Sequence, residues 1–526
     1  MRHSGPGRAL AAALALALPS GAQQEGERAQ RPNVLFAIAD DWSAGHASCL
    51  GAAWVATPAF DRIAAEGVLF TRAHTPNAKC APSRAAILTG RNSWQLEAAA
   101  NHIAFFPSRF GGFFEALAAG GYETAFTGKG WGPGIAQRED GAARALTGRR
   151  FSDLEAPAPT TGISKISYAD NFEAFLDQRA AGRPFAFWYG GLEPHRGYEP
   201  GSGIAAGKDP ADISRVPSFW PDTPAVRSDM LDYAVEVEHF DRHLGRMLDA
   251  LAVRGLADST IVLVTSDHGM PFPRAKGQAY PLSNEVPLAI RWPGRIAAGQ
   301  LLDDFVSLID LAPTILDAAA VEPIGMAEIT GRSLLPRVLG AQRFPHRDHV
   351  LLGKERHDVG RPQDGGYPIR GIRRGPWLYL INHEPSRWPA GNPETGYLNC
   401  DASPTKSALL SRRREAGADP FWDLCFGPRP REELYHLGAD PDAVVDLAGR
   451  DGFAAMQRQL RAELEAELEA EEDPRAAGNG AIFDSYPVAH RGQRGFYERF
   501  QAGERPPTGW VLRTDYEPEP VPFRPR

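Results

Sequence analysis

The sequence contains few cysteines, which excludes a fold held together by disulfide bonds. Only Cys49, Cys80, Cys400 and Cys425 occur in 526 residues, too few for a disulfide framework even in an oxidising compartment. Cys400 and Cys425 could pair or could remain free thiols, because sequence alone cannot place their Cα atoms within bridging distance. The chain is long enough for one large domain with a sizeable core and a smaller appendage.

Long basic runs are also absent. The 57 Lys+Arg residues are outnumbered by 65 Asp+Glu, and this mildly acidic balance argues against nucleic acid as a partner. A basic start, an apolar run from Ala9 to Pro19 and the small residues Ser20-Gly21-Ala22 predict a signal peptide over residues 1–22. The alternative, a membrane anchor, needs about twenty apolar residues. We therefore expect a periplasmic or secreted protein without stable membrane insertion.

Three continuous apolar runs predict buried strands. Val34 to Ala39 ends in Asp40-Asp41, and Ile261 to Thr265 is followed by Ser266-Asp267-His268; the third run is Phe185 to Tyr189. Helical patterns lie between the runs, at residues 57–66, 113–119 and 228–254. This alternation predicts an α/β fold with a mostly parallel sheet covered by helices on both faces. Ligands of such sheets bind at the carboxyl ends of the strands, where these acids fall.

The composition and pattern of the sequence change near residue 343. Short strand-like segments at residues 350–352 and 377–381, many Pro and Gly residues and a charged helix at residues 453–472 predict a smaller α+β subdomain over residues 343–526. Residues 23–342 then form the larger, catalytic domain. The proline-rich tail beyond Tyr516 is expected to be extended or disordered.

The segment Cys80-Ala81-Pro82-Ser83-Arg84, continued by Leu88-Thr89-Gly90, is the most specific motif in the chain. It resembles the C-x-P-S-R…L-T-G signature of the type I sulfatase family, and the resemblance extends over nearly the whole mature chain. It implies an alkaline phosphatase-like fold. It also implies that Cys80 is oxidised to 3-oxoalanine (formylglycine) by a formylglycine-generating or anaerobic sulfatase-maturing enzyme.

Formylglycine would make residue 80 the nucleophile, since its hydrated aldehyde carries two hydroxyls on one carbon. A helix starting near Pro82 would point backbone N–H groups at the incoming anion. Arg84, one turn further on, would neutralise the oxygens of the hydrate. Without modification, Cys80 would be an ordinary buried thiol.

The acids at the predicted strand ends suit a hard cation. Asp40, Asp41, Asp267 and His268 would supply ligands, together with the formylglycine at residue 80, and the resemblance implies that the ion is one Ca²⁺. The alternatives are helix caps for the two aspartates of the first pair and a core histidine at position 268.

Three further segments resemble the parts of the family that bind sulfate. Lys129 and Lys276 are expected to bind sulfate oxygens, and His195 to contact sulfate and protonate the leaving group. Most sulfatases carry G-K-x-H, but Trp131 stands here where the histidine is expected. His102 could replace that histidine near the substrate, although a purely structural role is the simpler hypothesis.

The substrate follows less directly. The segments from Asp267 to Tyr280, Pro194 to Arg196 and Arg356 to Arg370 resemble the heparan N-sulfatase branch of the family. This implies glycosaminoglycan degradation and a sulfated carbohydrate, N-sulfoglucosamine, as substrate. Candidate substrate-binding residues are His102, Glu355, Arg356 and His357.

Three other functions stay open. The enzyme could remove an O-sulfate from another glycan. It could hydrolyse a phosphoester or phosphonate, as members of the same superfamily do. Because of Trp131, it could also be a glycan-binding pseudoenzyme without activity.

Overall fold

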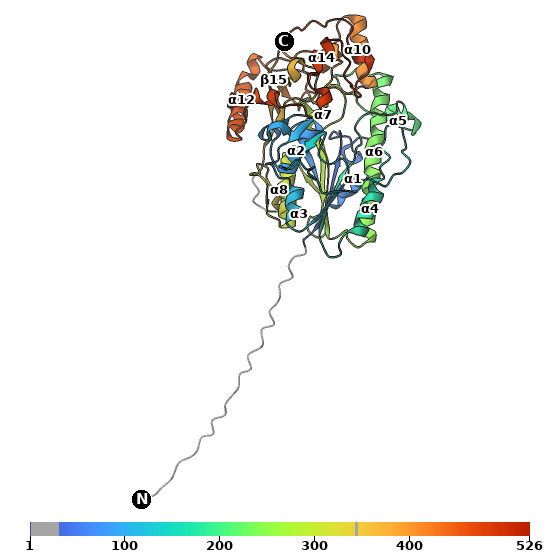
Figure 1. The fold of residues 1–526 in the computed structure, drawn as a ribbon, viewed down its shortest axis with the longest axis vertical. Helices are drawn as coiled ribbons and strands as arrows, with labels where there is room; N and C mark the ends of the chain where they lie inside the picture. Colours follow the sequence, from blue (N-terminus) through green and yellow to red (C-terminus); the bar gives the residue numbers. More distant parts are fainter. Residues whose placement is uncertain (2–30, 342–345, 526) are drawn as a thin grey trace. The chain divides into compact units, whose positions relative to one another are not determined.

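The computed structural model describes Met1, residues 31–341 and residues 346–525 (Figure 1). The predicted signal peptide, apart from Met1, lies outside the described residues. From Arg31 onward the chain forms one compact unit, so the boundary at residue 342 stays a prediction. No helix of the described part combines the length and apolar character needed to cross a membrane.

A nine-stranded sheet runs through the centre of this unit (Figure 1). The strand order is β10-β2-β9-β8-β1-β7-β4-β6, with β11 also pairing with β2. Every pairing is parallel except the two made by β9, which confirms the mostly parallel sheet. The strands are β1 (Asn33–Ala39), β2 (Val68–His74), β4 (Glu123–Gly128), β6 (Arg149–Arg150), β7 (Phe185–Gly190), β8 (Thr260–Ser266), β9 (Glu285–Arg291), β10 (Gln300–Leu302) and β11 (Val306–Ser307).

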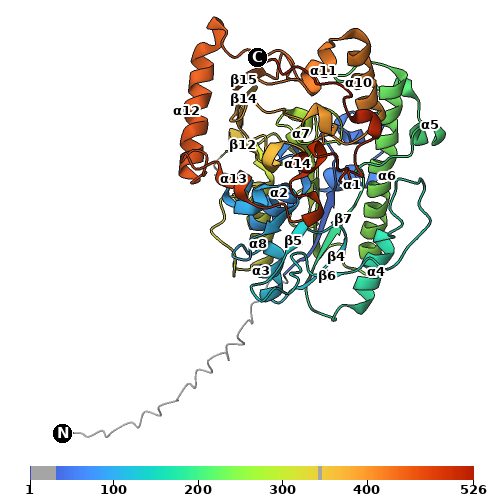
Figure 2. The same cartoon turned by 45° about the horizontal axis from the view of Figure 1, so that its top comes forward.

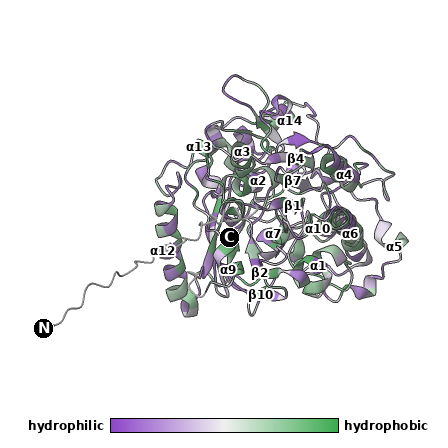
Figure 3. Ribbon diagram, turned by 90° about the horizontal axis from the view of Figure 1, so that it is seen from below, coloured by the Kyte–Doolittle hydropathy of each residue, from purple (hydrophilic) through white to green (hydrophobic). Residues whose placement is uncertain are grey.

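Helices cover both faces of the sheet because its central strands are apolar on both sides. In β1, Leu35 and Ala37 join one hydrophobic core, while Val34 and Phe36 join the core on the opposite face. Seen from below, β1, β7 and β4 lie between the two groups of helices (Figure 3). One group comprises α1 (Pro58–Glu66), α4 (Tyr168–Gln178) and α6 (Pro224–Val253), the other α2 (Cys80–Thr89), α3 (Phe113–Ala119) and α8 (Leu311–Ala319).

A second, antiparallel sheet follows in the chain. It has the order β12-β13-β14-β15, and α12 lies beside it (Figure 2). Leu460, Leu464 and Leu468 of α12 are its buried residues, while the rest of this strongly charged helix stays in water. The elements are β12 (His349–Lys354), β13 (Ile369–Arg374), β14 (Trp377–Asn382), β15 (Glu432–His436) and α12 (Ala454–Ala470).

The C-terminal tail is extended and packed. Beyond Tyr516 the described residues contain no helix or strand, and the ring of Phe523 lies 5.0 Å from that of Trp388. Cys400 and Cys425 are both buried free thiols, so the pairing left open by the sequence is not formed. Shorter elements are α5 (Ser202–Ala205), α7 (Pro281–Asn284), α9 (Leu335–Val338), α10 (Pro404–Ala416), α11 (Pro420–Cys425), α13 (Ile482–Ser485), α14 (Phe496–Gln501), β3 (Ala104–Phe106) and β5 (Gly134–Ala136).

Candidate active site

Two neighbouring parallel strands bring their terminal acids together. Asp40 and Asp41 follow β1, and Asp267 and His268 follow β8, which pairs with β1 in register. Two hydrogen bonds join the ends of the two strands. Asp267 N donates to the Ala39 carbonyl at 3.1 Å, and Asp41 N donates to Asp267 Oδ1 at 3.2 Å. All four polar side chains are buried.

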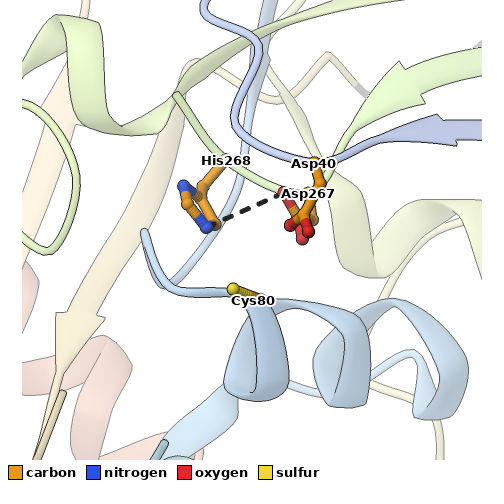
Figure 4. A group of neighbouring side chains, drawn as sticks. All are labelled: Asp40, Cys80, Asp267 and His268. Atoms are coloured by element: carbon orange, nitrogen blue, oxygen red, sulfur yellow. Dashed lines mark ion pairs between the residues drawn. The ribbon is translucent and has the colours of Figure 1, made fainter. Parts of the chain in front are cut away.

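Cys80 faces these acids from the N-terminus of α2 (Figure 4). It is the first residue of the helix, whereas the sequence placed the helix start near Pro82. Arg84, one turn on, donates from Nε to Asp267 Oδ2 at 2.8 Å and lies with Nη2 3.6 Å from Asp40 Oδ1. The same helix therefore presents both the thiol and a buried guanidinium to the acids.

Several groups around Cys80 favour negative charge on its side chain. Burial alone raises the pKa of the thiol, but the ammonium groups of Lys129 and Lys276 and the His102 ring bring this pKa well below its ordinary value. The helix N-terminus favours negative charge in the same way. The position is thus built to stabilise an anion beside residue 80.

The acids can hold a metal ion. One ligand atom each from Asp40, Cys80, Asp267 and His268 lie within 4.8 Å of one another. Asp40 Oδ1 has no hydrogen-bond partner among the described residues and lies 3.6 Å from Arg84 Nη2, while His268 Nε2 forms an ion pair with Asp41 Oδ1 at 2.9 Å. Buried carboxylate oxygens gathered this closely fit a hard divalent cation such as Ca²⁺.

The charge states of these groups support that fit. Burial and the neighbouring Asp40 carboxylate raise the pKa of Asp267 to about 7. Burial lowers the pKa of His268, but Asp267 and Asp41 outweigh it and raise this pKa to about 10. A metal ion bound to these acids would supply the positive charge that the proton on His268 otherwise gives.

Two lysines reach the same acids from other elements. Lys129 Nζ lies 2.6 Å from Asp40 Oδ2, and Lys276 Nζ lies 2.7 Å from Asp41 Oδ2. Lys129 is placed by its backbone N–H, which donates to the Gly190 carbonyl at 2.7 Å. At Gly128 a Cβ atom would come within 2.0 Å of that carbonyl oxygen, so this close approach requires glycine.

A cavity of about 560 Å³ opens onto this cluster. Its size suits a small ligand such as one sugar residue. A larger cavity of about 1010 Å³ is formed mainly by the C-terminal tail and contains none of the residues predicted for the site. The lining of the smaller cavity is Asp40, Cys80, His102, Lys129, Gly132, Pro133, Gly162, Ser164, Leu192, Glu193, His195 and Arg196.

The orientation of the His195 ring is fixed by the backbone carbonyl of the next residue. Its Nδ1 lies 2.7 Å from the Arg196 carbonyl, so Nδ1 carries the hydrogen and donates it. Arg196 in turn binds Asp229 with two hydrogen bonds, of 2.7 and 2.9 Å. Nε2 of His195 is left to face a ligand.

His102 lies between Cys80 and an acid. Its Nδ1 is 3.4 Å from Asp358 Oδ1, and the other oxygen of Asp358 lies 2.8 Å from Lys79 Nζ. Nε2 of His102 is buried without a well-oriented hydrogen bond among the described residues. This gives an aspartate–histidine pair beside residue 80, which has the parts of a general base.

Trp131 does not take part in this arrangement. Its Nε1 donates to the Ala81 carbonyl at 2.9 Å, and its ring packs at 5.1 Å against Phe106. The side chain therefore supports the start of α2 and offers no group that could accept a proton.

The structure does not bring Glu355, Arg356 and His357 to the cavity. Glu355 pairs with Arg370 and Arg475, at 2.8 and 2.6 Å. Arg356 donates to the Tyr486 carbonyl at 2.9 Å, and His357 Nε2 lies 2.9 Å from Asn77 Oδ1. Substrate binding by these three residues stays a prediction.

Three residues around the site were missed by the sequence analysis. Lys79 and Asp358 form the ion pair behind His102, and Asp401 lies 3.0 Å from Lys276 Nζ. The position of Lys79 next to Cys80 was the only signal available for it. Asp358 and Asp401 belong to no recognisable motif, so only the fold could reveal them.

Comparison with known proteins decides the family. The Sulfatase family model matches residues 32–321. This chain belongs to the sulfatase family. Its human relative N-sulphoglucosamine sulphohydrolase is 30% identical over 485 residues, covering 85% of this chain and 92% of the relative. N-acetylglucosamine-6-O-sulfatase of Bacteroides thetaiotaomicron is 28% identical and covers 63% of this sulfatase and 75% of its own length.

Solved structures show the same fold. An enzyme in complex with its substrate D-glucosamine-2-N,6-O-disulfate has a TM-score of 0.59 at 22% identity, covering 84% of this sulfatase and 98% of that chain. The phosphonate monoester hydrolase of Agrobacterium radiobacter has the same TM-score at 20% identity, with 85% and 97% covered. The fold is alkaline phosphatase-like, and the sulfatase is a hydrolase of sulfuric esters or sulfamates.

Proposed function

We propose that this sulfatase removes the sulfate group from the nitrogen of a terminal N-sulfoglucosamine of heparan or heparin. The observation that carries the proposal is the cavity of about 560 Å³, whose lining brings Cys80 together with Asp40, Lys129, His102 and His195. The similarity to a human enzyme named for N-sulphoglucosamine supports the choice of substrate.

Residue 80 and a calcium ion supply the chemistry at sulfur. As formylglycine, residue 80 provides a hydrated aldehyde that attacks sulfur with one hydroxyl and releases sulfate through the other. Calcium, held by Asp40, Asp41, Asp267 and His268, would polarise a sulfate oxygen. The buried guanidinium of Arg84, which interacts with charge on residue 80, balances that charge.

Lys129, Lys276 and His195 bind the sulfate group. The ammonium groups of Lys129 and Lys276 approach Asp40 and Asp41 from two different segments of the chain. There they neutralise the sulfate oxygens. His195 lines the cavity with its Nε2 free, since Nδ1 donates to Arg196. When Nε2 is also protonated, it delivers that proton to the leaving nitrogen, which keeps the electron pair of the broken S–N bond.

His102 replaces the histidine that the G-K-x-H motif would have supplied at position 131. Asp358 orients its ring through Nδ1, and Nε2 faces residue 80. His102 thus accepts the proton that a hydroxyl of residue 80 must lose. Lys79 keeps Asp358 in place through the 2.8 Å ion pair.

Two events must precede activity. The predicted signal peptide over residues 1–22 directs the chain to the periplasm or the exterior. A formylglycine-generating or anaerobic sulfatase-maturing enzyme must also oxidise Cys80. Because Cys80 is 2% exposed in the folded protein, that enzyme acts on the chain before folding is complete.

The test is sulfate release from N-sulfated and O-sulfated glucosamines, using calcium-loaded protein whose Cys80 peptide carries formylglycine by mass spectrometry. We expect selective release from N-sulfoglucosamine. Release only from an O-sulfated sugar would replace the substrate and keep the chemistry. No release from any member of the panel would contradict the proposal and favour a pseudoenzyme.

O-sulfated N-acetylglucosamine is the second candidate, because the relative from Bacteroides thetaiotaomicron is named for it. A phosphonate or phosphoester is less favoured, since the likeness to the phosphonate hydrolase is 20% in sequence. Including a phosphonate monoester in the same panel separates this third possibility.

A further inference from the structure

A carboxylate from the C-terminal part of the chain lies beside the sulfate-binding groups. One ligand atom each from Asp401, Asp41 and His195 lie within 4.8 Å of one another. Asp401 Oδ2 is 3.0 Å from Lys276 Nζ, and the Asp401 side chain is 7% exposed. An acid at this position is unexpected, because sulfate is itself negatively charged.

Lys276 already balances part of this charge. Its ammonium lies between Asp41 Oδ2 at 2.7 Å and Asp401 Oδ2 at 3.0 Å. One carboxylate would be enough to hold the lysine, because a single well-placed ion pair compensates one charge. The second carboxylate therefore requires another explanation.

The chain holds Asp401 firmly in place. Lys406 donates to the carbonyls of Gly396 and Cys400, at 2.9 and 2.7 Å, and pairs with Asp515 at 3.1 Å. Thr405, at the start of α10, donates to Asp229 Oδ2 at 2.6 Å, and Asp229 also binds Arg196. The loop that carries Asp401 and the segment that carries His195 are thus tied to the same buried acid.

The position of the His195 ring indicates which part of the substrate lies near Asp401. In the proposed function His195 protonates the atom that leaves sulfur, so a group near the His195 ring lies near that atom. A sulfamate presents an N–H there, which donates a hydrogen bond. A sulfate ester presents a bridging oxygen, which only accepts, and a carboxylate next to it is repelled.

We propose that Asp401 makes this sulfatase selective for a sulfated nitrogen over a sulfated oxygen. Its carboxylate accepts the N–H of the sulfamate. When the S–N bond breaks and sulfur bonds to the oxygen of residue 80, nitrogen keeps the electron pair and takes the proton from His195. A further proton from water gives the ammonium product, which Asp401 pairs with as a counter-ion. The inference rests on the proposed function and deepens it.

The test compares Asp401→Asn with the wild type on two substrates, N-sulfoglucosamine and 4-nitrophenyl sulfate, an aryl O-sulfate. Asparagine keeps the shape and removes the charge. We expect kcat/KM for N-sulfoglucosamine to fall by roughly 10–100-fold, the contribution of a hydrogen bond to a charged group. Hydrolysis of the aryl sulfate should change by less than about threefold or rise, because an oxygen leaving group gains nothing from the charge.

Equal losses on both substrates would overturn the inference, since they would mean that Asp401 acts only by holding Lys276. Asp442→Asn, which removes a remote carboxylate paired with Arg215, is the matched control and should leave the ratio of the two rates unchanged. If the proposed function itself is wrong, the result is different: the wild-type enzyme does not hydrolyse N-sulfoglucosamine.

A second measurement needs no variant. Product inhibition of the wild type should be at least tenfold stronger with glucosamine, which carries the ammonium, than with glucose, which carries a hydroxyl there. Equal inhibition by the two sugars would overturn the inference even if Asp401→Asn did not fold. Asp401→Glu should restore part of the preference, as it keeps the charge.

Discussion

Two buried clusters of charge in this sulfatase differ in one respect. In the first, near the second sheet, Arg370 binds Asp473 and Glu355, and Arg475 completes the set. Among the described residues, no buried side-chain nitrogen or oxygen of these four is left without a hydrogen bond. We call them the paired cluster.

The second cluster, at the ends of β1 and β8, comprises Asp40, Asp41, Asp267 and His268. Within this cluster three carboxylates face a single histidine, which pairs with Asp41 at 2.9 Å, whereas the paired cluster has two guanidinium groups for two carboxylates. Removing charges from water is costly, and an ion-pair cluster that serves only stability balances its own charges. The excess of carboxylates, gathered with Cys80 at a spacing that suits a metal ion, therefore distinguishes a binding site from structural ion pairs. The comparison also explains why Glu355, which had been a substrate-binding candidate, lies away from the cavity.

The largest effect is expected at the nucleophile. Cys80→Ala removes the side chain that is to become formylglycine, and sulfate release should fall by roughly 10⁴-fold or more. Only one small buried side chain changes, so the thermal unfolding midpoint should stay within a few degrees of wild type. Residual release above that level in a discontinuous sulfate assay would mean that another group attacks sulfur.

The base beside the nucleophile should have the next largest effect. His102→Ala should lower kcat by roughly 10²-fold or more, the usual contribution of a general base. Adding Trp131→His should recover part of this loss, because it returns a histidine to the position where related sulfatases carry one. A His102→Ala enzyme with unchanged kcat would reduce His102 to a structural residue.

The paired cluster should respond in stability and leave catalysis unchanged. Glu355→Gln leaves the guanidinium groups of Arg370 and Arg475 with less opposing charge, and the free energy of unfolding should fall by about 3 kcal/mol. Urea denaturation measures this loss, while KM for the sugar should stay as in wild type. A raised KM at unchanged stability would return Glu355 to the substrate-binding site.

Much of the fold could be predicted from the sequence, because continuous apolar runs specify strands buried on both faces. The runs at residues 34–39, 185–189 and 261–265 are β1, β7 and β8. Periodic patterns likewise located α1 and α3. The helix start at Cys80 was missed by two residues, since Pro82 suits any position in the first turn.

The site could be predicted only where residues belong to motifs. Cys80, Arg84 and the strand-end acids are close in sequence to the elements that carry them. Asp358 and Asp401 come from loops far along the chain, and their distance to Cys80 depends on how the second sheet and α10 pack. The burial of Glu355 and its ion pairs with Arg370 and Arg475 likewise depend on how distant segments pack.

Calcium binding tests the difference between the two clusters most directly. Calcium titrated calorimetrically into chelator-treated wild-type protein should bind at one site, and Glu355→Gln should bind it equally well. Asp267→Asn should bind none, because it removes a ligand charge from the strand-end cluster. A wild-type protein that binds no calcium, or an Asp267→Asn protein that binds it as tightly as wild type, would contradict the account.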